Sequence, residues 1–469
     1  MRHKNIDSIN VSNNRQLFVD DYLIDSNQDI DFKLHNLIPR ETALDLSSPW
    51  EGVTCDYHKV FKDGEKFRMY YRGTSHSGYT INSMLSLNEK VVKSHAEVIC
   101  YAESDDGVNW IKPSLGLFEF AGSKNNNIVW MSEFETHDLV PFKDENPICK
   151  EEERYKGIVW VKNFIYALKS PDGLKWSFMR DEPILTDGPF DSQNVPMWDP
   201  FRSCYVIFTR GKIGQGGSFG GGYRWIRTAT SENFLDWSDL IPIETTGSSL
   251  EHLYTNGVVS YERSPGLYLG FPRRFSPARL PFKDSTWPGT SDSVFMSSRD
   301  GIHWDRRFME SFIRPGLDER NWTSRNNLLS CGILQTSNTE LSMYILRHRD
   351  FPSCRFDRAT IRLDGFVSIN GGYGGGEIST KLLHFSGQNL YLNYSTSAAG
   401  FIKIELQSPN GKYIEGYSIA DSPEIFGDHC EGLIRWKNGA NLPVEAVQSG
   451  LVKLRFILKD ADIYSFKFA

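Results

Sequence analysis

The feature of this sequence that most constrains its fold is a short phrase that recurs along most of its length. Each copy joins a strand-like segment to Asp-Gly or an equivalent pair and then to Trp. The copies read ESDDGVNW, KSPDGLKW, TSENFLDW and SSRDGIHW, and a divergent one, IRLDGFVS, begins at Ile361. Their equivalent positions are separated by 66, 61, 67 and 64 residues, and are Asp106, Asp172, Asn233, Asp300 and Asp364. Such regular spacing indicates an internal repeat.

Each copy has the pattern of a β-hairpin, because Asp-Gly readily takes the positive φ of a tight turn between two strands. A second hairpin pattern lies upstream of each copy, as in HKVFKDGEKFRMYYRG and YKGIVWVKNFIYALKS. Two hairpins per repeat make a four-stranded meander, which is the size of a propeller blade. The high aromatic content of 13% also favours β-structure. The sequence therefore predicts an all-β fold, a five-bladed β-propeller followed by a C-terminal β-sandwich.

The two ends of the chain differ from the repeat. The segment RQLFVDDYLI precedes the first repeat, and we expect it to close the ring by completing the last blade, which would cover exposed strand edges. After GGYGGGE, short alternating segments such as FIKIELQ and LVKLRFIL predict the sandwich. The expected domains are residues 1–370 for the propeller and 371–469 for the β-sandwich.

Charge and cysteine content narrow the classes of partner. The formal net charge of −7 disfavours nucleic acid as a partner but is compatible with a neutral sugar. No run approaches the ~18 apolar residues of a membrane span, so we expect no membrane association. The N-terminus lacks a signal-peptide pattern, so we expect a cytoplasmic protein, or a secreted or periplasmic one if a signal peptide has been removed. Seven cysteines without CxxC spacing predict reduced thiols and no zinc site. We expect no cofactor, with room only for a structural calcium ion.

Polar residues cluster where each upstream hairpin begins. In a propeller these positions converge on one central funnel although they are far apart in sequence. Unpaired buried carboxylates are costly, which suggests that they face a wet funnel and serve in acid–base chemistry on a glycosidic bond. Amides, Arg and aromatic rings would bind the sugar. The candidates are Glu51, Asp56, His137, Asp138, Asp191, Gln193, Asn194, Trp198, Glu251, His252, Tyr254, Asn256, Arg325 and Asn326.

A structural interpretation competes at every one of these positions, because Asp and Asn before a strand commonly cap turns. We expect Asp63 and Asp199 to be turn residues. The aspartates inside the repeated phrase should be structural as well, since they recur at equivalent positions. His137 and His252 are more readily explained as packed or hydrogen-bonded histidines than as metal ligands.

The passages LFVDDYLI, PWEG, GLFEFAGSKNNNIVW, DSQNVPMWD, HLYTNGVVSYE and FMSSRDGIHWDRRFMESFIRPGL resemble the five-bladed β-propeller glycoside hydrolases of families 43 and 32. The likeness is strongest to uncharacterised bacterial proteins that are similar to family 32. By resemblance, Asp56, Asp191 and Glu251 take the three catalytic carboxylate positions. The NDPNG and RDP motifs of the invertase branch are missing, which keeps four substitutes open: Asp21, Glu51, Asp138 and Glu310.

The resemblance implies a glycoside hydrolase that removes a terminal, furanosidic sugar from an oligo- or polysaccharide. Glu251 would protonate the leaving oxygen, Asp56 would act as base or nucleophile, and Asp191 would stabilise the oxocarbenium-like charge. The expected substrate-binding residues are Glu51, Asp138, Gln193, Asn194, Trp198, Tyr254, Asn256, Arg325 and Asn326. Two alternatives stay open. One is a glycoside phosphorylase that binds phosphate through Arg273, Arg274, Arg314 and Arg325, and the other is a non-catalytic carbohydrate-binding propeller.

Overall fold

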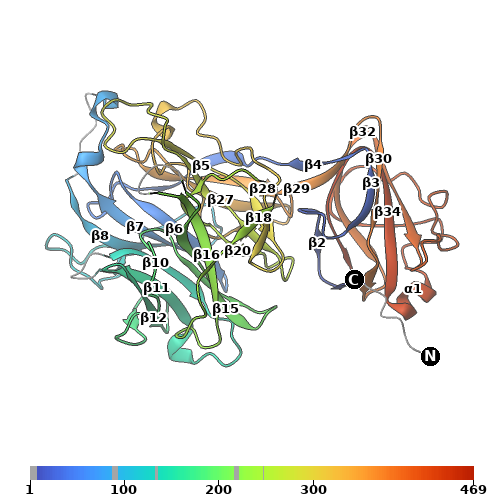
Figure 1. Ribbon diagram of the computed structural model, residues 1–469, viewed down its shortest axis with the longest axis horizontal. Coiled ribbons are helices and arrows are strands. Elements are labelled where there is room, and N and C mark those ends of the chain that lie inside the picture. The colour runs from blue at the N-terminus through green and yellow to red at the C-terminus, as the bar shows by residue number, and fades with distance from the viewer. Residues whose placement is uncertain (1–7, 87–92, 132–135, 216–220, 247) are drawn as a thin grey trace. The chain divides into compact units, whose positions relative to one another are not determined.

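The computed structural model describes residues 8–86, 93–131, 136–215, 221–246 and 248–469. The chain is nearly all-β, as predicted, and its strands form several separate sheets (Figure 1). It divides into two compact units. The first contains the described residues of Met1–Asn36 together with Glu262–Pro265 and Ile361–Ala469, and the second contains Leu37–Tyr261 and Gly266–Thr360.

The second unit contains four four-stranded sheets, each closely matching one predicted meander. All seven residues of Tyr155–Val161, a central strand, are buried, as expected for an apolar strand covered on both faces. The sheets comprise β6 (Asp56–Asp63), β7 (Lys66–Ser75), β8 (His95–Ser104) and β9 (Ile128–Trp130); β10 (Thr136–Lys143), β11 (Tyr155–Val161), β12 (Phe164–Ser170) and β13 (Ser177–Phe178); β14 (Val195–Asp199), β15 (Cys204–Ile213), β16 (Tyr223–Ser231) and β17 (Ile241–Pro242); and β26 (Leu334–Gln335), β27 (Glu340–Arg347), β28 (Arg355–Arg362) and β5 (Ile38–Asp45).

Between the third and the last of these meanders, the chain forms two smaller sheets instead of one. The first has the order β18 (Glu244–Thr246), β25 (His303–Asp305), β24 (Met296–Ser298), β21 (Tyr268–Gly270) and β20 (Val259–Ser260). The second has the order β19 (His252–Leu253), β22 (Arg273–Ser276) and β23 (Thr290–Ser293). The fourth repeat therefore keeps both predicted hairpins in the first of these sheets, and β19, β22 and β23 form a separate ladder. Short 3₁₀ turns occupy Ser77–Tyr79, Asn82–Met84, Glu151–Glu153 and Glu319–Asn321.

The sheets of the second unit contact one another in a closed order. Strand β10 packs beside β6 and β7, β14 beside β10, and β19 beside β16. Asn327, which precedes β26, donates to the backbone of Ser291 in β23 over 2.8 Å. The last sheet then meets the first, because the backbone N–H of Val60 donates to the carbonyl of Cys331 over 2.9 Å. The first strands of successive sheets are therefore brought near a common centre.

The strand that completes the last sheet is not the expected one. Strand β5 (Ile38–Asp45) pairs antiparallel with β28, with Ile38 opposite Thr360. The expected segment, RQLFVDDYLI, belongs to the first unit instead. Its strand β2 (Gln16–Leu17) pairs there with the C-terminal strand Leu451–Phe468. The predicted boundaries of 1–370 and 371–469 accordingly differ from the observed division. The physical reason is that the unpaired N–H and C=O groups of a strand edge can bond to any extended segment that lies beside them. At the edge of β28 that segment is Ile38–Asp45, which follows RQLFVDDYLI in the chain.

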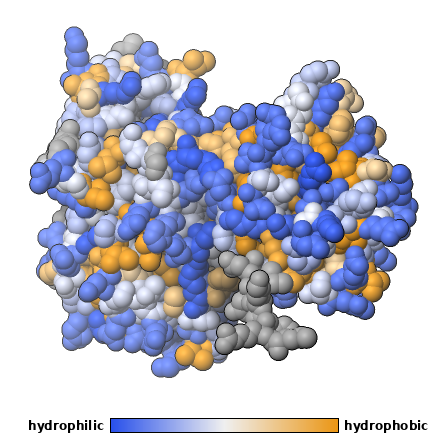
Figure 2. Space-filling model, turned by 45° about the vertical axis from the view of Figure 1, so that its right-hand side comes forward, coloured by the Kyte–Doolittle hydropathy of each residue, from blue (hydrophilic) through white to orange (hydrophobic). Residues whose placement is uncertain are grey.

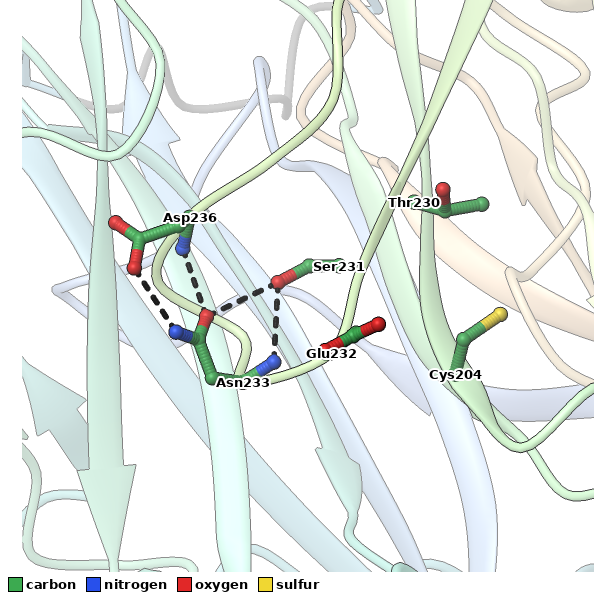
Figure 3. A pocket seen from close by; sticks show the side chains of 6 residues that line it. All are labelled: Cys204, Thr230, Ser231, Glu232, Asn233 and Asp236. Carbon is green, nitrogen blue, oxygen red and sulfur yellow. Dashed lines mark hydrogen bonds between the residues drawn. The ribbon is translucent and has the colours of Figure 1, made fainter.

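Four copies of the repeated phrase form outer turns of the second unit, and Figure 3 shows the third copy. The side-chain oxygen of Asn233 accepts the backbone N–H groups of Leu235 and Asp236, each over 2.9 Å. The hydroxyl of Ser231 accepts the N–H of Phe234 over 3.0 Å. Phe234 has φ 69°, the conformation that glycine takes in the other copies. In Figure 3, Ser231, Asn233 and Asp236 beside the hollow hydrogen-bond to one another, so we assign no functional site there.

Three other copies repeat this arrangement, which confirms that their aspartates are structural. Asp106, Asp172 and Asp300 each accept the two backbone N–H groups found two and three residues later. Asp199 is also a turn residue as predicted, because it accepts the backbone N–H of Phe201 over 2.9 Å. Asp364 in the divergent copy is different: in the first unit it pairs with Arg263 over 2.8 Å.

The first unit is organised around β34 (Leu451–Phe468), the last strand of the chain. One edge of β34 pairs along most of its length with β32 (Leu390–Gln407). The other edge pairs in turn with β31 (Leu383–Phe385), β30 (Gly376–Thr380), β29 (Val367–Gly371) and β2. The outer strands are β1 (Ile9–Ser12), β3 (Ile24–Gln28), β4 (Ile30–Leu34) and β33 (Asp428–Leu433), and a short helix α1 spans Val444–Ser449.

Both units have apolar interiors. One core in the first unit includes Phe18, Phe456 and Phe466, which are fully buried. On the face shown in Figure 2, hydrophobic side chains lie among hydrophilic ones. Among the described residues, no helix is long and apolar enough to cross a membrane.

Candidate functional site

The candidate site lies where the first strands of three sheets of the second unit meet. Asp56 is the first residue of β6, Asp138 lies in β10, and Asn194 immediately precedes β14. The backbone N–H of Asn194 hydrogen-bonds to the Asp138 carboxyl. Asp56 and Asp138 are almost completely buried, with exposed fractions of 0% and 3%. The fold therefore brings two carboxyl groups from separate repeats into one buried centre, as their positions in the sequence predicted.

Asp56 is surrounded by guanidinium groups. Nη1 of Arg273 lies 3.1 Å from Oδ1 of Asp56, and Nε of Arg349 lies 3.6 Å from Oδ2. The backbone N–H of Tyr57 also donates to Oδ1 over 3.0 Å. Burial alone would raise the pKa of Asp56, but Arg273, Arg349 and Arg72 hold it below its usual value. Asp56 is therefore an ionised carboxylate at neutral pH.

Asp138 has the opposite environment. Burial raises its pKa well above the usual value, and the negative charges of Glu97 and Asp56 raise it further against the opposing effect of Arg72. Its Oδ2 atom is buried and has no hydrogen-bond partner among the described residues. Asp138 therefore keeps its proton to a higher pH than an ordinary aspartate does. Two carboxyl groups whose pKa values are driven apart are the arrangement in which one serves as acid and the other as carboxylate.

The neighbours of Asp138 form a linked ionic group. Arg72 in β7 pairs with Glu97 in β8 over 3.1 Å, and its guanidinium lies 4.6 Å from the centroid of the Tyr57 ring. Nδ1 of His137 lies 3.3 Å from the second Glu97 oxygen. The His137 side chain keeps an exposed fraction of 18%, so this group connects the buried centre with solvent. As expected from the sequence, His137 is a histidine held by polar contacts.

Arginines also surround Tyr254 on the other side of the centre. The guanidinium carbon of Arg224 lies 4.9 Å from its ring centroid, that of Arg273 5.1 Å and that of Arg210 5.4 Å. Burial would raise the pKa of the Tyr254 phenol, but Arg325, Arg210 and Arg273 lower it below its usual value. The centre thus carries a concentration of positive charge.

Several polar atoms in this centre lack partners although they are buried. A buried polar group without a hydrogen bond costs about 1–3 kcal/mol, so native proteins keep few of them. Their concentration here indicates that they face a ligand or water. Among the described residues, the unpartnered atoms in this centre include Nδ1 of His58, Oδ2 of Asp138, Oε1 of Gln193, Oδ1 of Asn194, Nε and Nη2 of Arg273 and Nε of Arg349.

Strained backbone is found around the same centre. Five non-glycine residues there or directly beside it have positive φ: Tyr57 at 56°, Arg325 at 66°, Asn327 at 59°, His348 at 56° and Asp350 at 76°. Such conformations cost about 1–3 kcal/mol each and cluster at functional sites. The strain supports the assignment of the candidate site to this region.

The other two predicted catalytic residues lie in different surroundings. Asp191 is 51% exposed and pairs with Arg210 over 2.6 Å, and its backbone carbonyl lies 3.4 Å from the Tyr254 hydroxyl. It therefore lies at the edge of the arginine group. Both Glu251 oxygens are engaged by guanidinium groups, one by Arg274 over 3.2 Å and the other by Arg306. Glu251 is thus held in an ion-pair network.

The side chains of four expected substrate-binding residues already bind or pack against other residues of the protein. Glu51 is fully buried and accepts the Tyr71 hydroxyl, Lys112 and the Ser48 backbone. The amides of Asn256 and Asn326 bind backbone carbonyls. Trp198 packs on Tyr205 with 4.9 Å between ring centroids. Because these contacts arise only in the folded chain, the sequence could not separate the four residues from Gln193, Asn194, Tyr254 and Arg325, which do lie in the centre.

The remaining candidates lie away from the centre. Asp21 belongs to the first unit, and Glu310 is exposed. Of the four arginines named for a phosphate site, Arg273 and Arg325 lie in the centre, whereas Arg274 pairs with Glu251 and Arg314 is exposed. In the described part of the chain, no group of three or more His, Cys, Asp or Glu side chains is arranged to hold a metal ion.

Sequence reasoning missed Arg72, Glu97 and Arg349, because charged residues within or just after a strand normally alternate toward solvent. It also missed Trp287. The Trp287 ring is 37% exposed, lies 6.3 Å from the Tyr79 ring and has the Arg325 guanidinium 5.2 Å from its centroid. An exposed aromatic face beside a polar centre is a suitable platform for a sugar ring. The sequence signal was a Trp in a long loop between β22 and β23, outside the repeated phrase.

Neither a protein-family model nor the sequence of a curated protein matches the chain. Solved structures similar to it include glycoside hydrolases. One described as a glycoside hydrolase has 13% identity and a TM-score of 0.48, with 69% of this chain and 92% of that chain covered. A family 43 arabinoxylan arabinofuranohydrolase from Bacillus subtilis has 12% identity and a TM-score of 0.42, covering 92% and 99%. A β-1,2-mannobiose phosphorylase from Listeria innocua has 11% identity and a TM-score of 0.47, covering 70% and 97%. None of these likenesses singles out family 32.

Proposed function

We propose that the chain is a carbohydrate-active enzyme that cleaves a glycosidic bond at the buried centre of a five-bladed β-propeller. The five blades would be the four meanders and the pair of smaller sheets, and the first unit would be the predicted β-sandwich, now including the N-terminal strands. The closed order of the sheets supports this architecture.

The observation that carries the enzymatic proposal is that Asp56 and Asp138 lie in one buried centre with pKa values shifted in opposite directions. Asp138, whose pKa is raised, would donate its proton to the leaving glycosidic oxygen, in place of Glu251. Asp56 is ionised and would supply the negative charge that stabilises an oxocarbenium-like transition state. Asp191 would bind hydroxyls at the edge of the site, and Trp287 would stack on a sugar ring. The expected substrate remains a terminal sugar of an oligo- or polysaccharide.

A glycoside phosphorylase is the second candidate, and the arginines around the centre favour it. Such an enzyme transfers the sugar to phosphate instead of water, and Arg273 and Arg325 are placed to bind an anion. Asp138 would donate its proton in either reaction, so the identity of the acceptor decides between them.

The test is turnover of a panel of nitrophenyl glycosides and plant or algal oligosaccharides, with and without inorganic phosphate. The enzymes compared are wild type, Asp138→Asn and the control Asp187→Asn, which alters an exposed carboxylate of the same unit. We expect turnover that falls about 10²–10⁴-fold in Asp138→Asn and stays unchanged in the control. Phosphate dependence would select the phosphorylase. Oligosaccharide binding without turnover of any substrate would instead support the non-catalytic carbohydrate-binding propeller.

A further inference from the structure

The candidate centre is closed to a glycan in this structure. The exposed fractions are 0% for Asp56, 3% for Asp138, 2% for Tyr57 and 9% for Tyr254. A proton donor must come within about 2.6–3.2 Å of the glycosidic oxygen, measured between heavy atoms. A sugar can therefore reach the Asp138 carboxyl only if a segment that covers the centre moves aside.

Two loops from different sheets of the second unit meet each other, and we call them the latch loops. The first, residues 76–86, follows β7 and contains the 3₁₀ turns Ser77–Tyr79 and Asn82–Met84. The second, residues 277–289, joins β22 to β23. Connections longer than about 12 residues without a strand are uncommon in compact domains, and many of them cover or line functional sites.

The contacts between the latch loops are few and lie at the surface. The Asp284 carboxylate accepts the backbone N–H of Ser83 over 3.0 Å and its hydroxyl over 2.7 Å. The Thr286 hydroxyl donates to the carbonyl of Gly78. Ser83 and Asp284 are both exposed. Water competes for exposed hydrogen bonds, so these contacts add little net stability and can break without unfolding of the sheets.

The junction of the latch loops lies beside the candidate centre. In the second loop, the Trp287 ring has the Arg325 guanidinium of the centre 5.2 Å from its centroid. In the first loop, Ile81 is fully buried, and its backbone N–H donates to the carbonyl of Asp350 over 3.2 Å. Asp350 in turn pairs over 2.7 Å with Arg349, which belongs to the centre. Each latch loop therefore contacts the centre or a residue that pairs with it.

We propose that the latch loops close the candidate centre, and that a glycan enters when the contacts between Ser83 and Asp284 break. Opening moves Trp287 away from Arg325, and closing brings its ring onto the bound sugar. Closure of this kind excludes water from the reacting groups. The inference rests on the proposed function for the identity of the ligand, whereas the burial of the centre and the contacts between the loops do not depend on it.

The experiment is hydroxyl-radical footprinting of the full chain, in which mass spectrometry measures the oxidation rate of individual side chains. This rate rises with the exposure of a side chain to solvent, and no ligand is needed. The reporters of the centre are Tyr57 and Tyr254, and the internal control is Tyr101, which is 1% exposed in a core of the second unit.

The latch variants are Asp284→Ala and Ser83→Ala, and the matched control is Lys283→Ala, which changes an exposed neighbour in the same loop. Thermal unfolding checks that each variant is folded. Either latch variant alone makes the comparison.

We expect Tyr57 and Tyr254 to be oxidised about two- to tenfold faster in each latch variant than in the wild type, since the loss of a side-chain hydrogen bond raises the population of the open state by about that factor. The rate at Tyr101 should stay unchanged. The Lys283→Ala variant should give the wild-type rates at all three tyrosines.

Wild-type oxidation rates at Tyr57 and Tyr254 in both latch variants would overturn the inference. A parallel rise at Tyr101 would also overturn it, because the substitution would then loosen the whole unit. If glycans are cleaved in an Asp138-dependent reaction while the footprint does not change, the inference fails and the proposed function stands. If the footprint changes as expected but no glycan is cleaved, the latch stands and the enzymatic proposal fails.

Discussion

The protonation of Asp138 can be measured through its effect on stability. In the folded chain its pKa lies well above the ordinary value of 3.8. Between these two values the folded state keeps a proton that the unfolded state has lost. The free energy of unfolding therefore decreases as pH rises across this window, by about 1.4 kcal/mol for each pH unit. Below the ordinary value both states are protonated and the effect vanishes.

The substitution Asp138→Asn removes this titration while keeping a neutral side chain of the same shape. Relative to wild type, the variant should gain stability as pH rises above about 4, reaching about 2.7 kcal/mol more at pH 6 than at pH 4 if the folded pKa exceeds 6. Guanidinium unfolding curves at pH 4, 5, 6 and 7 measure this difference, with Asp187→Asn as the control whose curve should stay parallel to wild type. A variant whose stability runs parallel to wild type over this range would show that Asp138 is ionised, and the assigned proton donor would be wrong.

Three further predictions follow from the site. Asp56→Asn leaves the fully buried Arg273 without the carboxylate it pairs with, although Arg349 keeps Asp350 at 2.7 Å, so denaturant unfolding should show a loss of about 3–5 kcal/mol; a loss below 1 kcal/mol would contradict the pairing. Glu251→Gln should retain at least a tenth of wild-type kcat, because the side chain is held by ion pairs; a loss of a thousandfold would restore Glu251 as the proton donor. Trp287→Ala should raise KM by roughly tenfold with little change in kcat, since a stacking surface worth about 1–1.5 kcal/mol is removed; an unchanged KM would exclude Trp287 from substrate binding.

The repeat made much of the fold predictable, because the hydrogen bonds of its turn join residues only a few positions apart. Four copies of the phrase form the expected turn, in which one side chain satisfies two backbone N–H groups a few residues away. Phe234 shows how strongly the turn is specified, since it keeps a positive φ even where glycine is replaced. Strand pairing between distant segments was less predictable. The polar segment Ile38–Asp45 completes the last sheet as an exposed edge strand, whereas the more apolar Arg15–Ile24 was the natural expectation from pattern alone.

The candidate site was predictable where position in the repeat determined it. Asp56 begins β6 and Asp138 lies near the start of β10, and the fold brings them together. Their roles depend on neighbours that are distant in sequence. Arg273 and Arg349 lower the pKa of Asp56, whereas Glu97 helps to raise the pKa of Asp138. No local pattern contains that information.

The pairing of β5 with β28 has a consequence for how the chain is made. Ile38 can pair with Thr360 only after Thr360 has been synthesised. More than two thirds of the polypeptide must therefore leave the ribosome before the last sheet gains its outer strand. The central strand of the first unit, Leu451–Phe468, is synthesised later still. During synthesis the early strands would therefore expose unpaired edges, which invites association between nascent chains. Expression at low temperature, or with chaperones in excess, should raise the yield of soluble protein for this reason.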